Sequence, residues 1–216
     1  MFLLDKKGIC HVVGAGEFCI RFFHPSAEDL VIAADAGYLH LQKLGWEPDM
    51  VLGDFDSLQN IPSHPCVVLL PTEKDDTDML HAVKIGLEKG FRRFALHGAL
   101  GGSRFDHSLA NLQTLLYLTH HGANGFLFGN DGTVITALHN GSLQLSDHNR
   151  GVLSVFCMGD RAEGVRLSGL KYPLENHTLT CDMPLGVSNE FIGKTAEISV
   201  KDGTLLLIWN DSEFKI

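Results

Sequence analysis

Two carboxylates one residue apart are the side chains of this sequence best placed to do chemistry. Asp54 and Asp56 follow a short apolar run, Met50 to Leu52, and Gly53 separates that run from the first carboxylate. On an extended backbone, side chains two residues apart face the same side, so both carboxylates can converge on one point. Oxygen ligands with no His or Cys beside them favour Mg²⁺, which commonly holds the phosphates of a substrate. A polar turn at the end of a strand is the alternative interpretation.

Further acidic residues follow two other predicted strands. Residues 30–34 are apolar and run into Asp35, after which a helical periodicity begins. Residues 67–70 form another apolar run, which leads to Lys74, Thr77 and Asp78 and then to a second periodic helix. Ligands of open α/β sheets bind outside the carboxyl ends of the strands, so these residues are expected to share one site.

A simpler interpretation exists for the acidic residues that precede the second helix. Asp75 or Asp76 can be the N-cap of that helix, and Asp78 can complement its dipole. In that case at least one of these aspartates has a structural role only.

A glycine-rich segment, Gly98 to Gly102, opens a third periodic helix. Such a loop presents backbone N–H groups and the positive end of a helix dipole to an anion such as phosphate. Arg104 can add a bidentate phosphate contact, and His107 lies on a helix face distinct from the apolar stripe. A plain turn with Asp106 as the N-cap is the alternative. The earlier Gly14-Ala15-Gly16 lacks the full dinucleotide fingerprint, and we interpret it only as a loop near the nucleotide.

The chain changes its pattern near residue 135. Before that point, apolar runs alternate with helix-period segments, which is typical of a parallel sheet flanked by helices. After it, short period-two segments are separated by turn signals, and Asn140-Gly141 and Asp202-Gly203 are predicted hairpin turns. The sequence therefore predicts an α/β protein with a mostly parallel, Rossmann-like catalytic domain at residues 1–138 and a C-terminal antiparallel β-sandwich at residues 139–216.

Composition excludes several classes of partner. A formal charge of −9 over 216 residues argues against a nucleic-acid backbone, which requires clustered Lys and Arg. It does not exclude a nucleotide, because Mg²⁺ can invert the local charge. The five cysteines are odd in number and show no CxxC spacing, which indicates reduced thiols. No apolar run has the length of a signal peptide or a membrane span, so we expect a cytoplasmic protein with no membrane partner.

Six segments, taken in order, resemble those of thiamine pyrophosphokinases, and the resemblance spans nearly the whole chain. They are Asp35 to Gly37, Pro48 to Ser57, Lys74 to Asp78, Gly101 to Asn111, Gly169 to Leu174 and Gly186 to Glu190. Similarity to that family implies an α/β catalytic domain, a β-sandwich that helps to bind thiamine, and a homodimer with its sites at the subunit interface. It also implies the reaction, in which ATP and thiamine give thiamine diphosphate and AMP.

The residues and the resemblance together suggest a role for each motif. The expected Mg²⁺ ligands are Asp35, Asp54, Asp56 and Asp78, and the expected catalytic residues are Asp54, Asp56, Asp78 and Arg104. The expected contacts to the co-substrate ATP are Asp35, Lys74, Thr77, Gly101, Gly102, Asp106 and His107, and those to thiamine are Ser188, Asn189 and Phe191.

Three positions depart from the family pattern. Ala36 stands where the family often has glycine, and Ser103 lengthens a loop that is often one residue shorter. Phe191 stands where the family can carry a tryptophan that stacks on the thiamine ring. We expect Phe191 to stack in the same way, and the alternative is that it is a core residue of the sandwich.

Other functions stay open at this point. A Mg²⁺-dependent nucleotide phosphohydrolase would use the same acidic cluster but would not need thiamine. A pyrophosphokinase acting on another alcohol, or a nucleotide-binding sensor module, would also fit the motifs. Against the sensor, crowded carboxylates raise one another's pKa and cost stability unless a cation is present.

Overall fold

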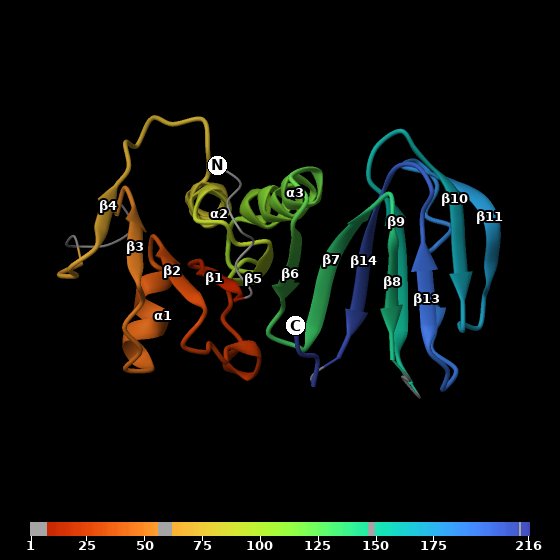
Figure 1. Ribbon diagram of the computed structural model, residues 1–216, viewed down its shortest axis with the longest axis horizontal. Helices are drawn as coiled ribbons and strands as arrows, with labels where there is room; N and C mark the ends of the chain where they lie inside the picture. Colours follow the sequence, from red (N-terminus) through yellow and green to blue (C-terminus); the bar gives the residue numbers. More distant parts are fainter. Residues whose placement is uncertain (1–7, 56–61, 147–149, 212) are drawn as a thin grey trace. The chain divides into compact units, whose positions relative to one another are not determined.

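The computed structural model describes residues 8–55, 62–146, 150–211 and 213–216, and the chain forms two compact units (Figure 1). The first unit comprises Met1–Gly132 and Ser212–Ile216, and the second comprises Thr133–Asp211. The division falls at residue 132 rather than at 138, because strand β7 (Thr133–His139) pairs along its whole length with β14 (Thr204–Asn210). The predicted combination of an α/β unit and an antiparallel unit is confirmed.

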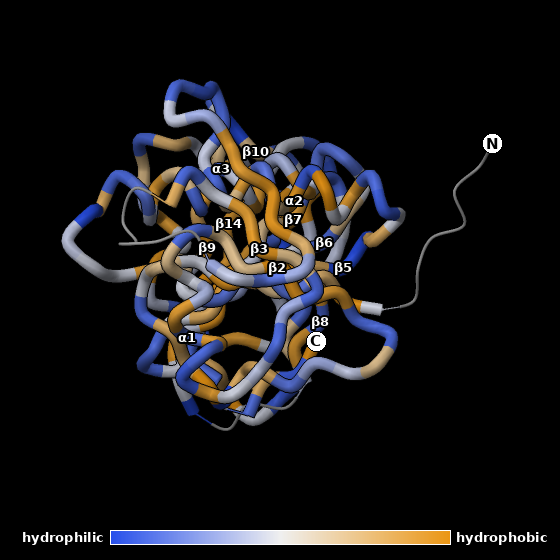
Figure 2. Tube along the Cα trace, turned by 90° about the vertical axis from the view of Figure 1, so that its left-hand side faces the viewer, coloured by the Kyte–Doolittle hydropathy of each residue, from blue (hydrophilic) through white to orange (hydrophobic). Residues whose placement is uncertain are grey.

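The first unit is built on a parallel sheet with strand order β6-β5-β1-β2-β3-β4. The strands are β1 (Cys10–Val13), β2 (Leu30–Ala34), β3 (Met50–Gly53), β4 (Val67–Leu69), β5 (Arg93–His97) and β6 (Asn124–Phe128). The helices are α1 (Gly37–Lys43), α2 (Asp78–Glu88) and α3 (Phe105–His120), with a 3₁₀ turn at Ile20–Phe22. The strands β2 and β3 are hydrophobic along most of their length in Figure 2, as expected when helices cover both faces of a parallel sheet.

Neighbouring residues of β1 face opposite sides of this sheet. Cys10 lies against α2 together with Phe94 of β5, and Gly86 of α2 allows this close approach: an added Cβ there would meet both side chains at under 3.0 Å. On the other face, Val13 packs with Leu41 of α1 in a buried cluster that also contains residues of β2 and β3. Buried side chains thus pack against both faces of β1.

The helix starts differ from the capping alternatives raised by the sequence. Thr77 is the N-cap of α2, and its Oγ1 accepts a hydrogen bond of 3.2 Å from the backbone N–H of Leu80. The alternative in which Asp75 or Asp76 caps this helix is therefore wrong. The N-cap of α3 is Arg104 and not Asp106, which lies in the first turn.

The second unit consists of two antiparallel sheets. One has the strand order β12-β9-β14-β7, and the other has the order β11-β10-β13-β8. The remaining strands are β8 (Ser142–Leu145), β9 (Val152–Cys157), β10 (Arg161–Ser168), β11 (Leu174–Thr180), β12 (Asn189–Glu190) and β13 (Ala196–Ser199).

The two Asx-Gly turns do not form hairpins, in contrast to the prediction. Strand β7 pairs with β14 and β8 pairs with β13, so Asn140-Gly141 and Asp202-Gly203 each carry the chain from one sheet to the other. The two turns bond to each other instead. The Asn140 N–H donates to the Gly203 carbonyl at 3.2 Å, and the Gly203 N–H donates to Asn140 Oδ1 at 2.9 Å. They close one end of the unit.

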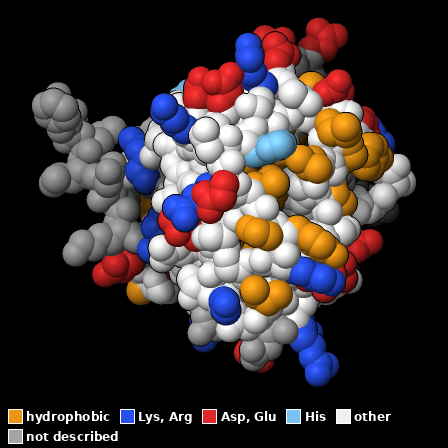
Figure 3. Space-filling view, turned by 90° about the vertical axis from the view of Figure 1, so that its right-hand side faces the viewer, with side chains coloured by type: hydrophobic (Ala, Val, Ile, Leu, Met, Phe, Trp, Pro, Cys, Tyr) orange, Lys and Arg blue, Asp and Glu red, His pale blue; other side chains and the backbone are white. Residues whose placement is uncertain are grey.

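The second unit also exposes several large hydrophobic side chains. Tyr172, Met183, Leu185 and Val187 are 40–64% exposed, and Figure 3 shows hydrophobic side chains in groups on one face. Exposed apolar groups of this kind are typical of interaction surfaces. Among the described residues, no helix is both long and apolar enough to cross a membrane.

Candidate active site

A pocket of about 800 Å³ in the first unit is lined by the loops that follow β1, β2, β3, β4 and β5. Asp35, Asp54 and Asp78 lie on its wall, as expected from the sequence. So do six more of the predicted contacts: Lys74, Thr77, Gly101, Gly102, Arg104 and His107. The carboxyl ends of the parallel strands thus bring together residues from four separate segments.

Two glycine loops interlock along one side of the pocket. The N–H groups of Gly14 and Gly16 donate to the carbonyls of His97 and Gly98 at 2.8 and 2.7 Å. The backbones approach so closely that a Cβ added to Gly98 would lie 2.2 Å from the Gly14 oxygen. Asn111 of α3 fixes the second loop, because its side chain donates to the Ala99 carbonyl at 2.7 Å. The Gly14 loop therefore belongs to the pocket wall.

The carboxylates Asp35 and Asp54 follow β2 and β3 directly. Asp35 has a φ of 50°, and its N–H donates to the Leu52 carbonyl at 2.7 Å. Phe55, the buried residue after Asp54, has a φ of 57°, which is rare for a bulky side chain. Backbone strain of this kind gathers at functional sites, where it fixes the direction of neighbouring side chains. Asp56, the other carboxylate of this motif, lies outside the described residues.

Lys74 bridges the carboxylates of Asp54 and Asp78. Its Nζ lies 3.1 Å from Asp54 Oδ2 and 3.0 Å from Asp78 Oδ1, and all three side chains are at most 22% exposed. Burial raises the pKa of Asp78, the ion pair with Lys74 opposes this, and the charges of Asp54 and Asp35 raise the pKa further. The three carboxylates therefore act on one another electrostatically.

The residues at the start of α3 divide into two roles. Arg104 and His107 line the pocket, whereas the exposed Asp106 makes a bidentate ion pair with Arg104, with contacts of 3.0 and 2.7 Å. Hydrogen bonds from Arg104 lower the pKa of Asp106 to about 2. Asp106, an expected contact to the nucleotide, pairs with Arg104 and is not part of the pocket wall.

The donor chemistry of this pocket fits Mg²⁺. Carboxylate oxygens are the preferred ligands of that ion, and the charges of Asp54 and Asp35 both raise the pKa of Asp78, so a cation bound among the three would be favoured. Within residues 8–55, 62–146, 150–211 and 213–216, no three potential ligands are grouped closely enough to hold an ion. Asp56, a fourth expected ligand, falls in the gap between these ranges.

The expected thiamine contacts lie in the second unit and differ in their surroundings. Asn189 is buried, accepts from the Tyr172 N–H at 2.9 Å, and donates to the Tyr172 carbonyl at 2.7 Å. Ser188 is exposed and has a φ of 60°. Phe191 is only 5% exposed and bonds through its backbone to Gly151, which favours the alternative of a core residue over a stacking one.

Several pocket residues were not predicted from the sequence. Thr72, Asp76, Met79 and Ser108 line the pocket in addition to the expected set. The sequence suggested that Asp76, which lies in the acidic segment before α2, is a helix cap rather than a residue of the pocket wall. In the structure its carboxylate pairs with Lys84 of α2 at 2.6 Å. Met79 and Ser108 each lie one residue after an expected contact, and helical periodicity alone does not tell which face meets a ligand.

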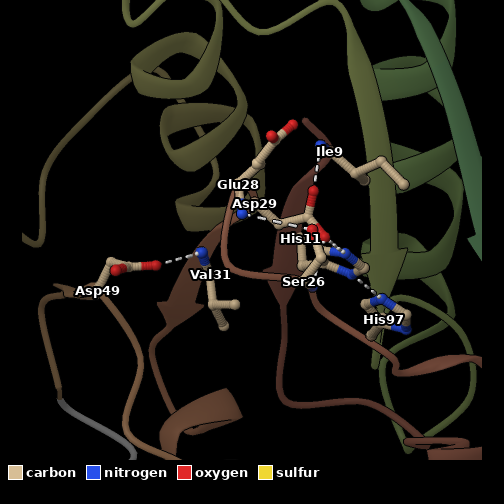
Figure 4. A network of polar contacts seen from close by, with 8 residues as sticks. All are labelled: Ile9, His11, Ser26, Glu28, Asp29, Val31, Asp49 and His97. Atoms are coloured by element: carbon tan, nitrogen blue, oxygen red, sulfur yellow. Dashed lines mark hydrogen bonds and ion pairs between the residues drawn. The ribbon is translucent and has the colours of Figure 1, made fainter. Parts of the chain in front are cut away.

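A pair of buried histidines lies on the neighbouring strands β1 and β5 (Figure 4). His11 Nδ1 and His97 Nε2 are 3.1 Å apart, and His11 Nε2 lies 3.6 Å from Asp29 Oδ2. Asp29 in turn accepts from the N–H groups of Ile9 and Ser26. These contacts assign the ring proton of His11 to Nε2, which faces Asp29. They assign the ring proton of His97 to Nε2, which donates to Nδ1 of His11. Among the described residues, Nδ1 of His97 has no hydrogen-bond partner.

Acid is expected to destabilise the first unit through these histidines. Burial lowers the pKa of His11, and it lowers the pKa of His97 well below the ordinary value of a histidine. The nearby His11 and His24 lower the pKa of His97 further. A histidine held neutral in the fold contributes stability above its unfolded pKa of about 6.5, and this stability is lost as the pH falls below that value. The lowered pKa of Asp29 matters only at a lower pH, near the usual range of an Asp.

Urea unfolding of the purified chain at several pH values between 5 and 7.5 measures this effect. Each proton taken up only on unfolding changes the stability by about 1.4 kcal/mol per pH unit. His97→Phe should give a shallower loss than the wild type, whereas His177→Phe, at an exposed position of β11, should leave the slope unchanged. Equal slopes in the wild type and His97→Phe would contradict the assignment.

The chain is thus an α/β protein with a pocket at the carboxyl ends of its parallel strands and with a second, antiparallel unit. Family models agree with this division: the catalytic domain of thiamin pyrophosphokinase matches residues 25–127, and its vitamin B1 binding domain matches residues 143–205. The chain belongs to the thiamin pyrophosphokinase family. It is accordingly an enzyme of the thiamine diphosphokinase type, as the order of its motifs indicated.

Individual relatives support this assignment. A thiamine pyrophosphokinase of Bacillus subtilis (strain 168) is 30% identical over 186 residues, which covers 83% of this chain and 86% of that protein. The crystal structure of thiamine pyrophosphokinase from Bacillus subtilis matches with a TM-score of 0.83 at 28% identity, covering 94% of this chain and 99% of that one. The enzyme from Geobacillus thermodenitrificans matches with a TM-score of 0.79 at 28% identity, covering 94% and 97%.

Proposed function

We propose that the chain transfers the pyrophosphoryl group of ATP to the primary hydroxyl of thiamine, with Mg²⁺ and the strand-end pocket of the first unit as the catalytic site. The observation that carries this assignment is the meeting of Asp35, Asp54 and Asp78 in one pocket with a lysine and two interlocked glycine loops. A phosphohydrolase would use similar carboxylates, but family membership favours the transferase.

The pocket residues divide the work of binding the triphosphate. Asp35, Asp54 and Asp78, with Asp56, would hold Mg²⁺, which when bound supplies positive charge to the phosphate oxygens. Arg104 lines the same pocket and can reach phosphate with the planar fork of its guanidinium. Backbone N–H groups of Gly101 and Gly102, at the start of α3, add favourable dipoles.

The chemical step follows from positioning. The thiamine hydroxyl attacks the β-phosphorus in line, the bond from this phosphorus to the oxygen of the α-phosphate breaks, and AMP leaves. A pocket carboxylate accepts the hydroxyl proton. Transfers of this type depend mainly on alignment and charge stabilisation rather than on covalent chemistry by the protein.

The second unit would contribute to thiamine binding and to assembly. Ser188 is exposed at a strained backbone position, and Asn189 fixes the chain beside it, so we assign Ser188 a direct contact and Asn189 a positioning role. The exposed hydrophobic side chains of this unit support a homodimer with the thiamine site at its interface. The reduced-thiol pattern of the sequence supports a cytoplasmic location.

Product analysis tests the proposed reaction. The purified chain is incubated with ATP, Mg²⁺ and thiamine, and control reactions lack one component each. Thiamine diphosphate and AMP are expected in equal amounts, and only when all three are present. Consumption of ATP without thiamine would instead identify a phosphohydrolase, and turnover without a divalent cation would contradict the metal assignment.

A further inference from the structure

Lys74 occupies a position that conflicts with cation binding by the carboxylates around it. Its ammonium group contacts Asp54 Oδ2 and Asp78 Oδ1 at 3.1 and 3.0 Å. A divalent ion held by these same oxygens would lie about 2.1 Å from each of them if it is Mg²⁺. Both cations cannot keep those positions, because they would overlap in space and repel each other.

The neighbouring charges explain why the lysine is held there. The carboxylates of Asp54 and Asp78 lie on one pocket wall with that of Asp35, and each carries a negative charge when it is ionised. Lys74 relieves that charge from within the chain. Its side chain is 15% exposed and also lines the pocket that would receive the triphosphate, so the ammonium has a second anionic partner within reach.

We propose that Lys74 is a tethered counter-ion that competes with the divalent cation for Asp54 and Asp78 and is released from them by the nucleotide phosphates. The inference rests on the proposed function, and it adds that metal and nucleotide bind together rather than metal first. Metal alone must displace the lysine from both carboxylates and binds weakly. A metal–nucleotide complex brings a phosphate for the lysine and a cation for the carboxylates, so both exchanges occur together.

The coupling between metal binding and nucleotide binding is reciprocal. If the nucleotide strengthens metal binding by freeing the carboxylates, then the metal must strengthen nucleotide binding by the same factor. Removing the ammonium should raise the affinity for metal alone, lower the affinity for nucleotide alone, and shrink the coupling between them. A lysine that only binds phosphate would lower nucleotide affinity but leave the affinity for metal alone unchanged.

Binding of Mn²⁺ alone to the full chain, followed by electron paramagnetic resonance and calorimetry, is the direct test. We expect Lys74→Met to bind Mn²⁺ at least tenfold more tightly than the wild type, and Lys74→Arg, which keeps the charge, to bind it about as weakly as the wild type. The matched control is Lys89→Met, since Lys89 is exposed at the C-terminal end of α2 and does not line the pocket. Its Mn²⁺ affinity should be unchanged.

A second readout needs no nucleotide and no turnover. The rise in melting temperature on adding Mg²⁺ should be larger for Lys74→Met than for the wild type, because at one ligand concentration a ligand that binds more tightly stabilises the fold more. Equal or weaker Mn²⁺ binding by a folded Lys74→Met would overturn the proposal.

Asp54→Asn in the Lys74→Met background tests the metal site and the counter-ion role of Lys74 separately. Loss of the tightened Mn²⁺ binding in the double variant places the ion at Asp54, as the proposed function requires. If the double variant keeps the tight binding, the ion sits elsewhere and both the metal assignment and the counter-ion role fail. If Asp54→Asn alone abolishes Mn²⁺ binding but Lys74→Met does not tighten it, the metal site stands and only the counter-ion role is wrong.

Discussion

Asp54→Asn is expected to lower kcat by about a thousandfold, because it removes one charge from the centre of the pocket without changing the shape of the side chain. Asp54 lies on the pocket wall, and its carboxylate is 14% exposed and bonded to Lys74. The fold should survive, since relief of repulsion with Asp78 offsets the lost ion pair. We expect a change in stability of at most about 1 kcal/mol.

Steady-state kinetics with ATP and thiamine, together with urea unfolding, measure both parts of this prediction. Asp75→Asn is the matched control, because Asp75 is exposed in the loop between β4 and α2 and is not part of the pocket wall. It should retain wild-type turnover. Wild-type turnover by Asp54→Asn would remove this residue from the catalytic site, and a large loss of stability would make its activity uninformative.

Gly98→Ala is expected to lower the free energy of unfolding by about 2–4 kcal/mol. Two costs add up in this value: the left-handed backbone conformation imposed on alanine, and the overpacked contact of its Cβ. Gly98 has a φ of 57°, and a Cβ there would lie 2.2 Å from the carbonyl oxygen of Gly14. That oxygen belongs to backbone and cannot move aside as a flexible side chain can. The two glycine loops must therefore separate, and nucleotide binding should weaken as well.

The comparison with Gly45→Ala isolates the steric part. Gly45 has a similar φ of 65°, but a Cβ there would meet nothing within 4 Å. Urea unfolding should show a loss of about 1 kcal/mol for Gly45→Ala, which carries only the cost of the backbone conformation. Equal losses for the two variants would show that the glycine loops are not packed against each other as described.

The sequence predicted the elements well where the signal is local. The apolar run at residues 30–34 has the bounds of β2, and the run at 67–70 is one residue longer than β4. The carboxylates expected after these strands line one pocket. The prediction failed where pairing is non-local. The Asn140-Gly141 signal marks a turn, but which strand lies next to which depends on contacts far apart in sequence.

The charge arrangement of the pocket could not be predicted for a similar reason. Lys74 and Asp78 are four residues apart, yet the lysine lies before the helix start, so helical spacing does not explain their contact. The bond to Asp54 spans twenty residues. The pairing of His11 with His97 depends on β1 and β5 being neighbours, and nothing in the spacing of the histidines indicates it.

The strand pair β7 and β14 has a consequence for the order in which the units are completed during synthesis. Thr133 and Asn210 are register partners, so the second unit begins and ends at one place and is inserted into the first. The first unit resumes afterwards, and Phe214 lies with its ring centre 5.0 Å from that of Phe126 of β6. The ribosome must therefore make the whole second unit before Phe214 can cover the hydrophobic surface of β6.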